Sequence, residues 1–246
     1  YSFPCQDLSI AGKKEGLTGK NSGLLWEVQR LLKSSPLPKI LLMENVKDII
    51  NKTNIDDFMI WINFLESIGY RNFYKKMNAS EYGSSTKRER VFMVSSLEKD
   101  KEFIFPNKTI FKTVREILEE PEENNKVDEN LGLKSIKGNK PIKLADYMGG
   151  GQGNRIYSID APGITLTASG GGHGGKTGLY LRDTGVYKLS GIEALKMMGW
   201  DLERIAFLKN KYSNSQLAKL AGNSISIDVL EKIMLQIYNI YFNKNK

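Results

Sequence analysis

Cysteine and histidine are nearly absent from the sequence. Its 246 residues include a single cysteine, Cys5, and a single histidine, His173. One thiol excludes an internal disulfide and is consistent with a reducing compartment. One imidazole without a cysteine pair excludes the common zinc cages, so we expect no metal. Cys5 therefore remains available for chemistry.

Long apolar runs are also lacking. No stretch approaches the roughly 20 residues that cross a bilayer, and no signal-peptide pattern opens the chain. Acidic residues are outnumbered, with 36 Lys and Arg against 28 Asp and Glu, which gives a net charge of +8. Such a charge attracts polyanions. Because a membrane role is disfavoured, nucleic acid is the expected partner.

The first hundred residues predict an α/β unit. Apolar residues at helical spacing alternate with short apolar runs typical of strands. The run before Glu44 is continuous, which favours a buried parallel strand with Glu44 at its carboxyl end. The expected helices span residues 23–32 and 55–68, and the expected strands span 39–43, 70–77 and 90–96.

The composition changes after residue 100. A charged stretch up to residue 147 is poor material for a core, and two glycine-dense segments follow, at 149–153 and 170–178. A strand-like run lies between them at 163–168, and an amphipathic helix is expected over 225–238. We therefore expect a domain boundary near residue 101.

Cys5 directly follows Phe3-Pro4, which resembles the end of a strand. A lone cysteine is usually buried filler. However, loops after parallel strands often hold reactive groups in α/β proteins. An exposed thiol there would form the nucleophilic thiolate.

Glu44 and the pair Arg88 and Arg90 each have an ordinary interpretation, as a surface carboxylate and a solvated charge run. Together with Cys5 at one sheet edge they would suit a reaction on cytosine. A thiolate that adds to C6 makes C5 nucleophilic enough to attack a methyl group. Glu44 would protonate N3 and an arginine would hold O2. Because C6 is hidden in a duplex, the base would have to be flipped out.

The order of four short motifs resembles the DNA (cytosine-5)-methyltransferase family over nearly the whole chain. The motifs are Pro4-Cys5-Gln6, Glu44-Asn45-Val46, Arg88-Glu89-Arg90 and Gly222-Asn223-Ser224. The resemblance implies that Cys5 is the nucleophile, that Glu44 is the N3 partner and that Arg88 and Arg90 clamp the substrate. It also implies that Pro4 and Asn223 lie near the methyl donor, S-adenosyl-L-methionine. Family members usually carry glutamine where Thr86 stands.

The glycine-dense segments resemble the two recognition loops of family members that methylate GCGC. By that resemblance Gln152 enters the duplex in place of the flipped cytosine, and Arg155 contacts a guanine edge. Ser9, in the loop after Cys5, and Thr165 are further expected DNA contacts. Ser169 stands where a bulkier aromatic residue is usual, so the GCGC assignment remains one interpretation. The glycines would let the backbone approach the base stack closely.

No glycine-rich strand-to-helix turn of the kind that binds the methyl donor precedes Cys5. We therefore expect this chain alone to bind the donor poorly. The missing strands would come from a separate chain or from a longer protein of which this is a part.

The resemblance implies an α/β, Rossmann-like methyltransferase core that is N-terminally incomplete, with a small glycine-rich target-recognition domain. Residues 1–100 would be the C-terminal half of the core, 101–189 the recognition domain, and 190–246 a segment whose helix returns to the core. The expected activity is methylation of cytosine C5 in duplex DNA, in a bacterial cytoplasm and near the nucleoid, as in restriction-modification systems. The alternatives are methylation of tRNA cytosine and a catalytically silent DNA-binding subunit.

Overall fold

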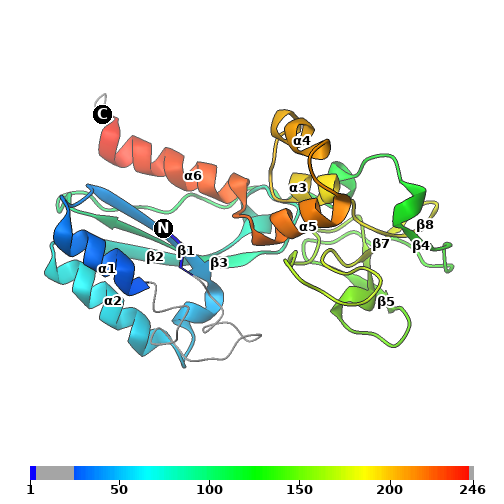
Figure 1. Cartoon of the computed structure of the whole chain (residues 1–246), viewed down its shortest axis with the longest axis horizontal. Helices are drawn as coiled ribbons and strands as arrows, with labels where there is room; N and C mark the ends of the chain where they lie inside the picture. Colours follow the sequence, from blue (N-terminus) through cyan, green and yellow to red (C-terminus); the bar gives the residue numbers. More distant parts are fainter. Residues whose placement is uncertain (4–24, 244–246) are drawn as a thin grey trace. The chain divides into compact units, whose positions relative to one another are not determined.

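The computed structural model describes residues 1–3 and 25–243 (Figure 1). The chain forms two compact units, each assembled from separate stretches of sequence. The sheet unit contains Tyr1–Met77, Glu89–Pro106 and Met234–Lys246, and the loop unit contains Asn78–Arg88 and Asn107–Ile233. The three-part division into residues 1–100, 101–189 and 190–246 stays a prediction.

The sheet unit has a three-stranded sheet in the order β1-β3-β2. Helices α1 and α2 lie on the same side of this sheet (Figure 1). Their apolar faces bury Leu25, Phe58 and Trp61 against Met43 and Met93 of the sheet. The elements are α1 (Leu25–Ser34), β1 (Ile40–Val46), α2 (Ile55–Ser67), β2 (Arg71–Asn78) and β3 (Glu89–Ser96), which confirms the helices and strands expected in the first hundred residues.

The direction of β1 within this sheet differs from the prediction. β1 pairs with β3 in antiparallel register, with Glu44 opposite Phe92. A parallel contact exists on the other edge of β1, where the Tyr1 amino group donates to the Leu42 carbonyl (2.6 Å) and the Glu44 amide donates to the Tyr1 carbonyl (3.2 Å). An apolar run predicts that a strand is buried but not which neighbours it has. β1 also runs two residues beyond Glu44, so Glu44 lies inside the strand.

The loop unit has a five-stranded sheet in the order β4-β8-β7-β6-β5. Only β6 and β7 pair in parallel among these strands. Its main core joins Tyr180 and Leu166 to Leu195, Met197 and Leu217. The strands are β4 (Lys126–Asp128), β5 (Lys143–Asp146), β6 (Arg155–Ser158), β7 (Leu179–Arg182) and β8 (Gly185–Lys188).

Four helices follow the second sheet. A capping box starts α3, because the Ser190 hydroxyl accepts from the Glu193 amide while the Glu193 carboxylate accepts from the Ser190 amide. The helices are α3 (Gly191–Met197), α4 (Leu202–Lys209), α5 (Asn214–Asn223) and α6 (Ile227–Ile237). The last of these confirms the helix expected over 225–238.

Residues 163–168, predicted as a strand, form no regular strand, and we call them the strap. The strap makes one parallel bridge, between Gly163 and Thr86. Beyond it, side chains replace the backbone ladder: the Thr86 hydroxyl donates to the Ile164 carbonyl (2.8 Å), and the Tyr180 hydroxyl accepts from the Ile164 amide (3.2 Å). Local alternation predicts an extended backbone but not these partners.

Candidate functional site

Glu44 and Arg90 meet on neighbouring strands of the sheet unit. Arg90 lies opposite Val46 in the β1–β3 register, two positions along from Glu44, so both side chains lie on the same face. The Arg90 Nε and Glu44 Oε1 atoms are 3.0 Å apart, and the two side chains are 18% and 16% exposed. The pair is therefore largely shielded but open on one side. The structure brings these two predicted site residues together.

The chain before Cys5 runs beside this pair. The Ser2 hydroxyl donates to Oε2 of Glu44 (3.1 Å), and the Asn45 side-chain amide donates to the Phe3 carbonyl (3.2 Å). Asn45 is 2% exposed, so its amide is committed to holding Phe3. Three predicted site residues, Pro4, Cys5 and Ser9, lie outside the described residues.

Arg88 has different partners from Arg90. It is 4% exposed and lies in the loop unit. Its guanidinium donates to the backbone carbonyls of Leu166 (3.3 Å), Gly222 (3.1 Å) and Ser224 (2.8 Å). The two arginines of one tripeptide thus make unrelated contacts, and no described contact joins Arg88 to Glu44.

Arg155 and Gln152 lie at the first predicted recognition loop. Gln152 begins the 3₁₀ turn η7 (Gln152–Asn154), and Arg155 begins β6. The Arg155 side chain is 44% exposed, and its Nε is 3.9 Å from the Asp146 carboxylate. A hydrogen bond from Lys143, more than the charge of Arg155, lowers the pKa of that carboxyl. Arg155 is therefore held loosely, with its guanidinium open to solvent.

Glycines let the two glycine-dense segments pack backbone against backbone. The Gly174 amide donates to the Gly153 carbonyl (2.7 Å). A Cβ at Gly153 would lie 1.8 Å from the Gly171 carbonyl oxygen. Glycine is required here for contact between the loops, a reason that the sequence analysis did not anticipate. The expected close approach to bases stays a prediction.

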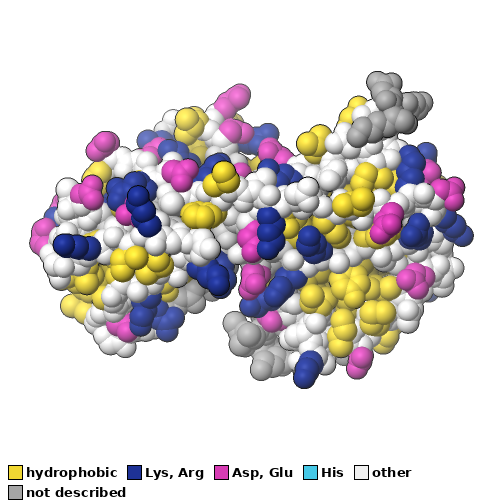
Figure 2. All heavy atoms as spheres, turned by 180° about the vertical axis from the view of Figure 1, so that it is seen from behind, with side chains coloured by type: hydrophobic (Ala, Val, Ile, Leu, Met, Phe, Trp, Pro, Cys, Tyr) yellow, Lys and Arg dark blue, Asp and Glu magenta, His cyan; other side chains and the backbone are white. Residues whose placement is uncertain are grey.

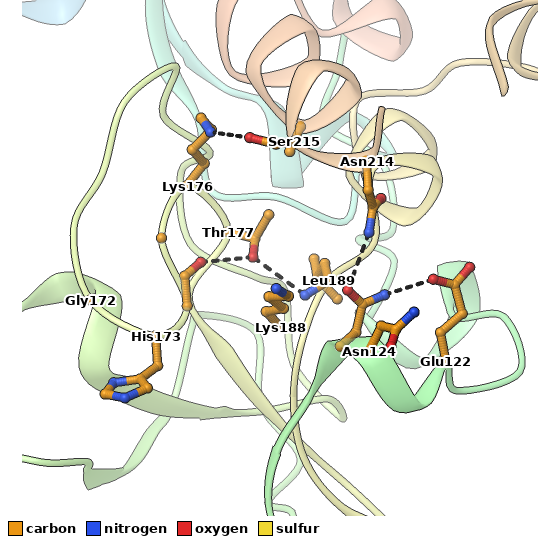
Figure 3. Close-up of a pocket in the computed structure, with 14 residues that line it drawn as sticks. Glu122, Asn124, Gly172, His173, Lys176, Thr177, Lys188, Leu189, Asn214 and Ser215 are labelled. Carbon is orange, nitrogen blue, oxygen red and sulfur yellow. Dashed lines mark hydrogen bonds between the residues drawn. The ribbon is translucent and has the colours of Figure 1, made fainter. Parts of the chain in front are cut away.

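A cavity of about 520 Å³ adjoins the second of these loops (Figure 3). Residues 172–177 line it together with Lys188 of β8 and the first turn of α5. The Lys176 ammonium donates to the Ser215 hydroxyl across it (2.9 Å), as Figure 3 shows. Lys188 also lines the cavity, and neither lysine was singled out from the sequence. Thr165 is half-buried and donates its hydroxyl to the Lys87 carbonyl.

Asn223, the remaining predicted donor contact, is exposed at the last position of α5. An exposed carboxamide can both donate and accept hydrogen bonds, so it fits a polar group of S-adenosyl-L-methionine. It does not by itself define a donor site. Within the described residues, no cluster of three metal-ligating side chains occurs, and no helix has both the length and the apolar character needed to span a bilayer.

Comparison with known proteins defines the class and then the family. The fold is that of the α/β methyltransferases: it matches an Entamoeba histolytica methyltransferase, EhMeth, with a TM-score of 0.70 over 97% of this chain and 76% of that one, at 16% identity. The Schizosaccharomyces pombe Dnmt2 methyltransferase matches with a TM-score of 0.67 over 98% of this chain and 78% of that one, also at 16% identity. Residues 1–239 match the model of the C-5 cytosine-specific DNA methylases. The chain belongs to that family.

Two bacterial relatives agree. The chain is 37% identical to the orphan methyltransferase M.SssI of Spiroplasma monobiae, over 96% of this chain and 64% of that protein. It is 33% identical to the type II methyltransferase M.HhaI of Haemophilus parahaemolyticus, over 97% of this chain and 73% of that protein. The chain therefore spans about two thirds of the length of these relatives. Nothing in the comparisons supports a separate chain that supplies the missing strands.

Proposed function

We propose that this chain carries the nucleophile and the pyrimidine-binding side chains of a DNA (cytosine-5)-methyltransferase that acts on a flipped cytosine. The observation that carries the proposal is the Glu44–Arg90 pair, beside which the backbone of Tyr1–Phe3 runs. Cys5 follows Phe3 by two residues, and two residues of extended chain span at most about 7 Å. A sulfur within that distance of Phe3 is within reach of a base held by Glu44.

The proposed reaction uses each of these groups once. The Cys5 thiolate adds to C6, and the electrons of the C5–C6 double bond move into the ring as Glu44 donates a proton to N3. C5 then attacks the methyl carbon, and a base removes the C5 proton. The returning electrons re-form the double bond and expel the thiolate. Arg90 holds O2 and, by its 3.0 Å contact, keeps the Glu44 carboxyl oriented.

S-adenosyl-L-methionine supplies, when bound, the electrophilic methyl group. Asn223 would hydrogen-bond it, and Pro4 would lie against it. The remaining third of the relatives' length leaves room for the other donor contacts, so this chain is proposed as the catalytic and DNA-reading portion of the enzyme.

Recognition of the target belongs to the loop unit in this proposal. Arg155 would read a guanine edge, because its guanidinium is exposed and loosely paired. Gln152 would fill the space left by the flipped base, with Ser9 and Thr165 as further DNA contacts. GCGC is the proposed target, and duplex DNA in the bacterial cytoplasm is the proposed substrate.

A covalent trap tests the activity. We expect a duplex with 5-fluorocytosine at the target position, incubated with S-adenosyl-L-methionine, to form an adduct that Cys5→Ala does not form. Fluorine cannot leave C5 as the proton does, so the thiolate is not expelled. Denaturing electrophoresis measures the adduct. An adduct with a matched RNA and not with DNA would favour the tRNA alternative, and tight DNA binding without any adduct would favour a silent DNA-binding protein.

A further inference from the structure

Three stretches far apart in the sequence meet at the side chain of Arg88. From this junction we infer that Arg88 is a positioning residue: it fixes the strap against α5 and so determines how sharply the recognition loops discriminate between DNA sequences. This inference rests on the proposed function. It gives Arg88 a role through the protein rather than through the substrate.

The strap depends on side chains for its attachment. After the single bridge at Gly163, its carbonyls are bonded by Thr86 and Arg88, at Ile164 and Leu166. Thr86 is fully buried, and its hydroxyl is 2.8 Å from the Ile164 carbonyl. A strap held by two side chains, rather than by a ladder, moves if either donor is lost.

The same guanidinium holds the end of α5. Carbonyls in the last turn of a helix have no donor within the helix. Arg88 supplies one to Gly222 (3.1 Å) and, just beyond the helix, one to Ser224 (2.8 Å). Gly222 allows the contact, because a Cβ there would lie 2.3 Å from the Thr167 carbonyl group. The strap is thus clamped between Arg88 and the end of α5.

The loop that follows the strap is tied to the other end of α5. The Thr167 amide donates to the Lys176 carbonyl (3.1 Å), and the Lys176 ammonium donates to Ser215 in the first turn of α5 (Figure 3). Lys176 is partly exposed, whereas Arg88 is buried. The exposed tie can exchange with DNA phosphate, and the buried one cannot. Arg88 is therefore the fixed point for the side chains that read bases.

Base reading needs more accurate positioning than phosphate binding does, because a hydrogen bond to a base edge loses strength steeply with misalignment. Loosening the strap should therefore reduce discrimination between sequences while leaving non-specific affinity in place. The experiment is selection of bound duplexes from a randomised pool by the full chain, followed by sequencing, so the target need not be known beforehand. Affinity for an unrelated duplex is measured separately by fluorescence anisotropy.

The variants are Arg88→Lys, which keeps the charge but has one nitrogen in place of the fork, and Thr86→Val, which keeps the shape and removes the hydroxyl. Arg204→Lys is the matched control, because Arg204 is exposed and pairs only with Asp201 of its own helix turn. We expect Arg88→Lys to lower the enrichment of the preferred sequence about tenfold, comparable to the loss of one good base contact. Thr86→Val should lower it in the same direction, with affinity for the unrelated duplex changed less than about twofold in both. Arg204→Lys should match the wild type.

Thr86→Val keeps the test open if Arg88→Lys fails to fold, which circular dichroism reveals. A wild-type preference that both variants retain would overturn the inference and leave the proposed function intact. Equal losses on all duplexes would overturn it as well, since they would make Arg88 a general determinant of stability. A wild-type chain without any sequence preference would contradict the proposed recognition, and this inference with it.

Discussion

At the scale of single residues, the pairing of Glu44 with Arg90 distinguishes this site from an ordinary surface ion pair. Both side chains are more than four-fifths shielded, and Ser2 adds a second hydrogen bond to the carboxylate. Glu44 is thus oriented by two partners from different segments. A carboxyl fixed in this way can deliver a proton to a single ring nitrogen, whereas a mobile one cannot.

The first prediction concerns the proton on Glu44. Glu44→Gln removes the proposed proton donor while nearly preserving its shape, so addition of Cys5 to a target pyrimidine should slow by about 10²- to 10⁴-fold. The rate of adduct formation measures it. Glu27→Gln is the control, because Glu27 is exposed and pairs only with Arg30 on α1. Equal rates for Glu44→Gln and the wild type would remove Glu44 from the mechanism.

The second prediction concerns Lys188, which lines the cavity beside the second recognition loop. If its ammonium contacts a DNA phosphate, Lys188→Ala should weaken binding to all duplexes alike and reduce the slope of log affinity against log salt by about 1. Anisotropy titrations between low and moderate salt give both quantities. Lys33→Ala, at the end of α1, should leave the slope unchanged. An unaltered slope in Lys188→Ala would exclude a phosphate contact.

At the scale of structural elements, the loop unit depends on close backbone packing and on one buried ion pair. The glycine-dense segments touch through Gly153 and Gly174. Arg182 and Glu193 form an ion pair of 2.6 Å with side chains 7% and 2% exposed. Each feature joins parts of the unit that the sequence separates.

The third prediction compares two glycines in these segments. Gly153→Ala should destabilise the chain by about 1–3 kcal/mol, because the new Cβ overlaps a carbonyl and the two loops must separate. Gly171→Ala should change stability by less than about 0.5 kcal/mol, since nothing lies within 4 Å of a Cβ there. Urea unfolding followed by circular dichroism measures both. Identical stabilities would mean that the loops do not rest on each other in solution.

The fourth prediction concerns the buried ion pair. Arg182 also donates to the Glu119 carbonyl (3.0 Å), and Glu193 caps α3. Arg182→Met leaves a buried carboxylate without its cation, which should cost about 3–5 kcal/mol. Arg204→Met removes an exposed pair and should cost less than about 1 kcal/mol. A small loss in Arg182→Met, measured by the same unfolding experiment, would mean that Glu193 is neutral or solvated.

At the scale of the whole molecule, the charge of +8 suits a polyanionic partner, and basic side chains are spread over the face that Figure 2 shows rather than gathered at one spot. Such a distribution favours general attraction to DNA, with discrimination left to a few contacts in the loop unit. The chain covers about two thirds of its relatives' length, so these properties are those of the catalytic and DNA-reading portion.

Much of this organisation could be predicted from the sequence, and the failures have physical causes. Apolar periodicity located the helices and strands of the sheet unit, and motif order placed Glu44 near Arg90. Two-residue alternation suggested that Arg88 and Arg90 act together, but the chain passes from one unit to the other between Arg88 and Glu89. The direction of β1 and the partners of the strap depend on contacts between distant segments, which local patterns do not encode.

The central claim is that Cys5 attacks a pyrimidine held by Glu44 and Arg90, and the most direct test needs no methyl donor. A duplex with pyrimidin-2-one at the target position lacks the electron-donating amino group, so its C6 accepts a thiolate without methyl transfer. We predict a covalent adduct of the wild-type chain that peptide mass mapping assigns to Cys5. A chain that binds this duplex and forms no adduct, or forms one on another residue, would contradict the account.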